Sequence, residues 1–352
     1  MRSSGFSGKH ISVSSQPRSI QDVARDPLWL ADRYDPGHDS IHFRYVDRDQ
    51  HRAATFLTDE YLGTEPSPIV IRREDVCAAA PKQGPIHFIF HSAFCCSTLL
   101  ARTFDLPGVS MGLREPTILN DIVGWRHRGG DPQKIGPVLD DTLAVLSRPY
   151  GSGEAIIVKP SNVCNGIAEA MIAGRPQARA ILLYAPLPIF LASVSKKGMW
   201  GRLWVRDLMI KQLKDGLIDL GFEDDDYLGL TDLQVAAVGW LAQQDLFARI
   251  YNRFGSERIL RLDSETLLDQ PCHNVSAIAN LFGLNLSKIQ IDEIIHGSAF
   301  STNSKTGLVF NREERDAEYN VAAQIHSEEI EKVTIWAKAV AVNAGLELQK
   351  NV

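Results

Sequence analysis

The chain has 352 residues, enough for one large α/β domain with additions or for two domains. Hydrophobic residues make up 44% of it and charged residues 23%, as in globular proteins that bury a substantial core. The formal net charge of -6 leaves no basic excess to neutralise phosphates, which argues against nucleic-acid partners. No apolar run has the length of a membrane span, so we expect no membrane partner.

The cysteines are few and unpatterned. Their number is odd and no two are spaced as CxxC, so neither a disulfide framework nor a zinc site is predicted. A reducing, cytoplasmic location fits this usage. The five are Cys77, Cys95, Cys96, Cys164 and Cys272.

The chain divides into three predicted parts. Residues 1–25 are polar and predict a disordered tail. Residues 26–84 predict an N-terminal extension packed on the core, with alternating runs at 41–46 and 54–57 that favour a small hairpin. Residues 85–352 predict the main α/β domain.

The main domain starts with a strand, a tight loop and a helix. An apolar run at 86–90 predicts a buried strand, residues 91–96 form the loop, and Ser97 and Thr98 precede a helical apolar pattern. This order is typical of a phosphate-binding loop, where backbone N–H groups and the helix dipole face the anion. The loop contains neither glycine nor lysine, so it is not a G-x-x-x-x-G-K-[ST] motif. The alternative is an ordinary turn with Ser97 as helix N-cap.

Further apolar runs alternate with helical patterns down to the C-terminus. This alternation predicts a three-layer α/β fold with a central parallel sheet and right-handed crossovers. The expected strands are residues 108–113, 155–158, 180–184 and 259–262, and the expected helices are 116–146 (interrupted at 129–132), 166–173, 187–194, 233–254 and 317–342.

Polar residues follow several of these strands. Glu115 and Lys159 each come directly after a predicted strand, as does the loop that starts at His91. Ligands of parallel sheets bind beyond the carboxyl ends of the strands, so these residues are expected to converge there.

The motifs, in order, resemble the PAPS-dependent sulfotransferase family (PAPS is 3′-phosphoadenosine-5′-phosphosulfate), in a divergent bacterial form. The resemblance implies a P-loop NTPase-like sulfotransferase architecture for roughly residues 85–307. The matching segments are Phe94-Cys95-Cys96-Ser97-Thr98, Lys159-Pro160-Ser161, Pro176-Gln177-Ala178, Ser193, Glu265-Thr266-Leu267 and residues 301–307.

The resemblance also implies roles. Lys159 is the cation for the transition state and Glu115 the base for the acceptor. Independently of the resemblance, we expect His91 to supply the donor that Phe94 cannot. PAPS is the donor substrate, and no metal is required. The residues expected to bind PAPS are Phe94, Cys95, Cys96, Ser97 and Thr98 at the 5′-phosphosulfate, with Ser193, Ser301, Ser304 and Lys305 at the rest of the molecule.

Each role has a plain structural alternative. Lys159 could be a solvated strand-end lysine, and Glu115 could pair with Arg114 or charge a helix N-terminus. His91 could be a satisfied structural group, Ser193 a plain helix serine, and residues 301–305 a polar surface loop.

The sequence departs from the family at positions that hold donor charge. Phe94 stands where the loop has a basic residue, and Cys96 where it has glycine. Tyr184-Ala185-Pro186 replaces an Arg-Asp-Pro whose arginine binds the 3′-phosphate. The basic residues that might compensate are Lys196, Lys197 and Arg202.

The expected activity is sulfuryl transfer from PAPS to a hydroxyl or amine of an unidentified small-molecule or peptide acceptor. One alternative is a divergent P-loop-type kinase, which needs a metal ligand, for which Asp263 is the candidate. The other is a non-catalytic nucleotide-binding scaffold on the same fold.

Overall fold

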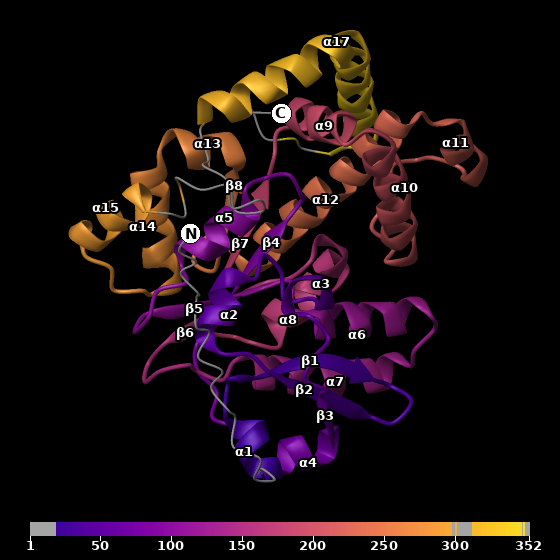
Figure 1. Ribbon diagram of the computed structural model, residues 1–352. Helices are drawn as coiled ribbons and strands as arrows, with labels where there is room; N and C mark the ends of the chain where they lie inside the picture. Colours follow the sequence, from indigo (N-terminus) through magenta and orange to yellow (C-terminus); the bar gives the residue numbers. More distant parts are fainter. Residues whose placement is uncertain (1–18, 298–299, 301–311, 347, 349–352) are drawn as a thin grey trace, which may run out of the picture.

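Five parallel strands form the centre of the molecule (Figure 1). A computed structural model describes residues 19–297, 300, 312–346 and 348, apart from the side chains of 224 and 312–325. The sheet order is β5-β6-β4-β7-β8, and every neighbouring pair is parallel, which confirms the predicted fold class. The strands are β4 (Ile86–His91), β5 (Ser110–Arg114), β6 (Ala155–Lys159), β7 (Ala180–Tyr184) and β8 (Ile259–Asp263).

Helices cover both faces of this sheet. On one face, His87 of β4 stacks on Phe282 of α14 (Pro271–Phe282), with ring centroids 4.9 Å apart. On the other face, Arg261 of β8 reaches Gln244 of α12 (Asp232–Phe254) at 3.4 Å. Because both faces are covered, the strands are continuous apolar runs rather than alternating ones.

The predicted helices of the main domain are present. The acidic run 223–226 starts a short helix that Glu223 caps. None of the helices in the described part of the chain is long and apolar enough to cross a bilayer. The remaining helices are α5 (Ser97–Thr103), α6 (Thr117–His127), α7 (Pro132–Leu146), η1 (Asn162–Ile167), α8 (Ala168–Ala173), α9 (Leu187–Lys196), α10 (Gly198–Lys214), α11 (Asp224–Gly229), α13 (Ser264–Asp269), α15 (Lys288–His296) and α17 (Arg312–Asn343), which lies across the top of Figure 1.

A small antiparallel sheet of order β1-β2-β3 lies below the parallel sheet in Figure 1. Tyr34 of this sheet packs on Trp125 of α6, with ring centroids 5.8 Å apart. The N-terminal elements are α1 (Ile20–Arg25), β1 (Trp29–Asp35), β2 (Ser40–Tyr45), α2 (Arg48–Ala53), α3 (Asp59–Leu62), β3 (Ile69–Arg72) and α4 (Arg73–Ala78).

Two N-terminal expectations need correction. Residues 54–57 are not a strand, because Ala54 ends α2 and the N–H of Leu57 donates to the carbonyl of Arg114 at 2.7 Å. Residues 20–25, expected to be disordered, form α1, with Ser19 and Asp22 in a capping box. Residues 1–18 lie outside the described part.

Candidate functional site

The loop after β4 makes its turn with left-handed residues that are not glycine. The φ angles are 71° at Ala93, 52° at Phe94 and 62° at Cys96. This conformation costs a residue with a Cβ atom about 1–2 kcal/mol. Surrounding contacts must therefore hold the loop in shape.

His91 is one of those contacts. Its Nδ1 accepts the N–H of Ala93 at 3.1 Å, so the proton is on Nε2, which donates to the carbonyl of Pro160 at 3.1 Å. The ring thus ties the loop to the segment after β6. This geometry favours the structural alternative for His91 and makes it a positioning residue.

Helix α5 starts with Ser97, and its N-cap is Cys96, in the left-handed region and without a side-chain cap bond. The alternative in which Ser97 is the helix N-cap is therefore wrong. Ser97 and Thr98 are 6% and 3% exposed, and their hydroxyls make no hydrogen bond to another described residue. Both residues are therefore buried at the start of α5.

Lys159 ends β6 with a fully buried side chain. Its ammonium forms an ion pair with the carboxylate of Glu115, and it lies 5.2 Å from the ring centroid of Phe56. Glu115 has a left-handed φ of 53°, and its N–H donates to the carbonyl of Lys159 at 2.6 Å. The alternative of a solvated lysine is therefore wrong.

Arg114 does not pair with Glu115. Its guanidinium is fully buried and faces Asp105 at 3.4 Å and the carbonyls of His51 and Ala54. Glu115 thus pairs with Lys159, while Arg114 attaches the N-terminal extension to β5.

The Lys159 ammonium also acts on the loop. Burial raises the pKa of the Cys95 thiol to about 11, and the positive charge of Lys159 opposes that rise. Burial also raises the pKa of the Cys164 thiol. The carboxylate of Glu115 adds to that rise, and the positive charge of Lys159 opposes it. Lys159, Glu115 and the loop therefore share one electrostatic environment at the carboxyl edge of the sheet.

Phe94, which stands where the loop of the resembled family has a basic residue, is held by aromatic contacts. It packs on Phe190 of α9 and on Trp204 of α10, with ring centroids 5.9 and 5.3 Å away. At this position the loop is held by apolar packing on two helices.

The segment Tyr184-Ala185-Pro186, which differs from the Arg-Asp-Pro of the resembled family, is also held by packing. Tyr184 is buried against Trp240 of α12, and the indole N–H of Trp240 donates to the carbonyl of Ala185 at 2.9 Å. Arg202, a candidate replacement for the missing arginine, is 3.2 Å from Asp232. It pairs there, at the start of α12.

The remaining expected PAPS-binding residues lie on α9 and near the C-terminus. Ser193 is buried on α9, where its hydroxyl donates to the carbonyl of Ile189 at 2.7 Å. The other expected residues, Ser301, Ser304 and Lys305, lie outside the described residues.

The metal ligand that a kinase would need is otherwise engaged. The carboxylate of Asp263 caps α13, accepting from the N–H groups of Glu265 and Thr266 at 3.0 and 2.9 Å. Within the described ranges, no three His, Cys, Asp or Glu side chains are grouped to hold a metal ion.

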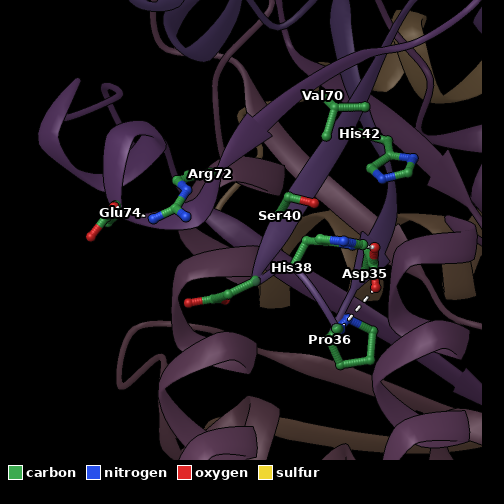
Figure 2. Close-up of a pocket in the computed structure, with 10 residues that line it drawn as sticks. Asp35, Pro36, His38, Ser40, His42, Val70, Arg72 and Glu74 are labelled. Carbon is green, nitrogen blue, oxygen red and sulfur yellow. Dashed lines mark hydrogen bonds and ion pairs between the residues drawn. The ribbon is translucent and has the colours of Figure 1, made fainter.

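A surface hollow of about 730 Å³ lies on the N-terminal sheet, at the turn between β1 and β2 (Figure 2). His38 pairs there with Asp35 at 2.6 Å, and Val70 of β3 contributes an apolar side chain. None of its lining residues belongs to the sheet edge that holds Lys159 and Glu115. The hollow and the sheet edge that holds Lys159 and Glu115 are therefore separate places on the molecule.

Two residues of the site were missed by the sequence analysis, Phe56 and Tyr61. Their rings meet edge to face, with centroids 5.6 Å apart. The only signal was the apolar run at 54–57, which we read as a strand.

No family model and no curated protein matches this chain. Solved structures similar to it include the sulfotransferase domain of the curacin biosynthetic pathway, with 12% identity and a TM-score of 0.41 over 76% of this chain and 99% of that one. The sulfotransferase domain of the Synechococcus PCC 7002 olefin synthase has 14% identity and a TM-score of 0.38, over 66% of this chain and 84% of that one. Sulfotransferase STF9 from Mycobacterium avium has 13% identity and a TM-score of 0.38, over 72% of this chain and 78% of that one.

All three are sulfotransferases, the family that the motifs resemble. At these TM-scores the likeness carries no functional conclusion.

Proposed function

We propose that this protein transfers a sulfuryl group from PAPS to a hydroxyl or amine of an acceptor. One observation carries the proposal: a fully buried lysine, Lys159, is paired with the carboxylate of Glu115 beside a strand–loop–helix turn. A buried charge is costly, and such pairs are concentrated at functional sites.

The reaction needs a base and a cation, and this pair supplies both. The acceptor oxygen bonds to sulfur, the bond from sulfur to the 5′-phosphate oxygen breaks, and the products are the sulfated acceptor and 3′,5′-ADP. The acceptor proton goes to the carboxylate of Glu115, which follows β5. The ammonium of Lys159 offsets the negative charge that develops on the leaving phosphate oxygen.

The loop after β4 is the proposed site for the 5′ end of the donor. The hydroxyls of Ser97 and Thr98 and the N–H groups of the loop would bind the phosphosulfate. For the 3′-phosphate, Ser193 on α9 remains the proposed ligand within the described chain. Ser301, Ser304 and Lys305 remain proposed on the resemblance. The five free thiols suit a reducing, cytoplasmic location.

The donor site is tested by calorimetric titration with 3′,5′-ADP, with ATP plus Mg²⁺ as the parallel ligand. We expect micromolar binding of 3′,5′-ADP, weakened about tenfold by Ser97→Ala, the loss of one hydrogen bond to a charged group. Thr103→Val, at the other end of α5, is the matched control and should leave the affinity unchanged. Tighter binding of ATP plus Mg²⁺ would favour a kinase, and no binding of either ligand would overturn the proposal.

A further inference from the structure

Exposed apolar side chains gather on one helix of the described chain. Helix α10 presents five large hydrophobic residues to solvent, each between 39% and 71% exposed. They are Met199, Trp200, Leu203, Ile210 and Leu213, and we call them the α10 stripe. Positions 199, 203, 210 and 213, with Arg206 between them, follow spacings of three and four and therefore lie on one face of the helix. An exposed apolar patch of this kind marks an interaction site, whereas single exposed residues do not.

The opposite face of α10 is fixed to the rest of the fold. A Cβ atom on Gly201 would clash with the carbonyl oxygen of Val194 in α9, so the two helices are in close contact there. Further along, the side-chain amide of Gln212 donates to the carbonyl of Gly239 in α12 at 3.0 Å. The fold thus holds α10 in place, and the rest of the described chain leaves the α10 stripe exposed.

Helix α11 adjoins α10, and both lie on the outside of the fold, at the right of Figure 1. The guanidinium of Arg206, which stands between Leu203 and Ile210 on the face of the stripe, donates to the carbonyl of Leu230 at 3.1 Å. Leu230 ends α11. Two residues before this contact, Leu228 is 84% exposed and adds an apolar side chain beside the α10 stripe.

The two helices carry opposite charge. Between positions 196 and 214 the chain has six basic residues and one acidic residue. The run 223–226, which starts α11, has four acidic residues and no basic one. The exposed side chains include Lys197 and Lys214 in the basic segment and Asp225 in the acidic one.

We propose that the α10 stripe is the contact surface for a second copy of this chain. In this dimer, α10 and α11 of one protomer meet α11 and α10 of the other about a two-fold axis. A two-fold interface is self-complementary, because the same patch is used twice in opposite directions. A surface with a basic and an acidic helix side by side fits that requirement, since each basic helix meets the partner's acidic helix. The apolar side chains form the centre of the interface and the charges its rim.

A lipid surface fits these observations less well. A basic helix with exposed apolar residues can lie on an anionic bilayer. The acidic run of α11 and the net charge of -6 would both be repelled by anionic lipid, whereas a second copy uses the acidic run. The 17 residues of α10 extend about 25 Å, less than an interface of about 800 Å² per partner needs, so α11 and Leu228 are part of the contact. We therefore expect a reversible dimer with micromolar affinity.

Sedimentation velocity of the full-length protein, from about 1 to 100 µM, tests the dimer. We expect the wild type to shift from monomer to dimer over this range and Leu203→Glu to raise the dissociation constant at least about tenfold. Ile289→Glu is the matched control, because Ile289 is equally exposed on α15, and it should dimerise as the wild type does. A wild type that is monomeric throughout, or a Leu203→Glu variant that dimerises normally, would overturn the inference.

The arrangement of the two helices is tested with reversed charges. Lys214→Glu and Asp225→Lys should each weaken the dimer, because each places like charges opposite one another. An equal mixture of the two variants should associate more strongly than either alone, since in the mixed dimer every altered helix meets an opposite charge. A mixture no better than the single variants would reject the two-fold pairing of α10 with α11. Binding of monomeric wild type to phosphatidylserine vesicles, lost in Leu203→Glu, would assign the stripe to a lipid surface instead. None of these outcomes depends on the proposed sulfuryl transfer.

Discussion

At the end of β6, the ammonium of Lys159 lies between a carboxylate and an aromatic ring, with no exposed surface. Removing one partner of a buried pair leaves the other charge unpaired, which is more costly than removing both. The pair is therefore best tested with neutral side chains of similar size, singly and together.

We expect Lys159→Met and Glu115→Gln each to lower kcat for sulfuryl transfer at least about a hundredfold, because each removes a group that acts in the transition state. The measurement is release of 3′,5′-ADP at saturating PAPS and acceptor. The double variant removes both charges, so it should fold at least as well as either single variant. If folded single variants retain wild-type kcat, the assigned roles are wrong.

Two buried histidines stay neutral in the fold and make it sensitive to acid. Burial lowers the pKa of His51 to about 3 and that of His87 to about 4, with nearby arginines adding to both effects. In the unfolded chain both would take up a proton below the ordinary value of 6.5. The unfolded state therefore binds more protons below pH 6.5, and stability falls as the pH is lowered from there to about 4.

The expected loss is about 1.4 kcal/mol per histidine for each pH unit within that window. Urea denaturation at pH 7.5 and at pH 5 would measure it. His51→Asn and His87→Phe should each make the free energy of unfolding less dependent on pH, whatever they do to its absolute value. His273→Gln, at an exposed side chain of α14, is the control variant.

At the scale of elements, the close approach of α5 to β5 positions the loop between β4 and α5, which we call the donor loop because we propose that it binds the donor. A Cβ atom on Gly112 of β5 would lie 2.6 Å from the backbone carbonyl oxygen of Ala101 in α5. Real Cβ contacts are not this short, so any side chain at position 112 would push the helix away. The start of the same helix carries Ser97 and Thr98.

We expect Gly112→Ala to lower the free energy of unfolding by about 1–3 kcal/mol and to weaken 3′,5′-ADP binding, because α5 shifts. Gly124→Ala is the matched control inside α6. Its Cβ meets only the flexible end of Arg128, at 3.1 Å, so the better helix propensity of alanine should leave stability equal or slightly higher. Thermal unfolding measures the stability of both variants, and calorimetric titration measures their affinity for 3′,5′-ADP.

The sequence predicted the central elements well because both faces of the parallel sheet are covered. The run 180–184 is a strand with the predicted bounds, since each of its residues is buried. β1 was missed because its side chains do not alternate: Asp32 is buried in an ion pair with Arg44, and the register shifts between Ala31 and Arg33. Lys159 and Glu115 were predicted from their places after strands. Phe56 was not, because its contact with Lys159 spans 103 positions of the chain, from 56 to 159.

On the scale of the whole molecule, the two sheets are joined by buried guanidinium groups. Arg148, which follows α7, is 3% exposed and donates to the carbonyls of Val23, Ala24, Asp26 and Trp29 in the N-terminal extension. A guanidinium buried without a carboxylate partner depends on such carbonyls. The extension and the α/β domain should therefore unfold together.

Hydrogen exchange followed by mass spectrometry tests this cooperativity. Amides of β2 and β4 are expected to exchange with the same free energy of opening, and Arg148→Met should lower both by the same amount, because four carbonyls, three of them in buried bonds, lose the Arg148 donor. Earlier exchange of β2 than of β4 would instead mean that the extension opens as a separate unit.

The packing of Phe94 gives the protein an optical property. The indole of Trp204 meets Phe94 of the loop at 5.3 Å, and Trp200, which is 60% exposed, stacks on Trp204 at 6.2 Å with 9° between the ring planes. Fluorescence of stacked indoles depends on their separation and on their access to water. A change in the loop therefore reaches an intrinsic fluorophore through one side-chain contact. If the loop binds 3′,5′-ADP as proposed, we expect its occupancy to change the tryptophan emission, with no label attached.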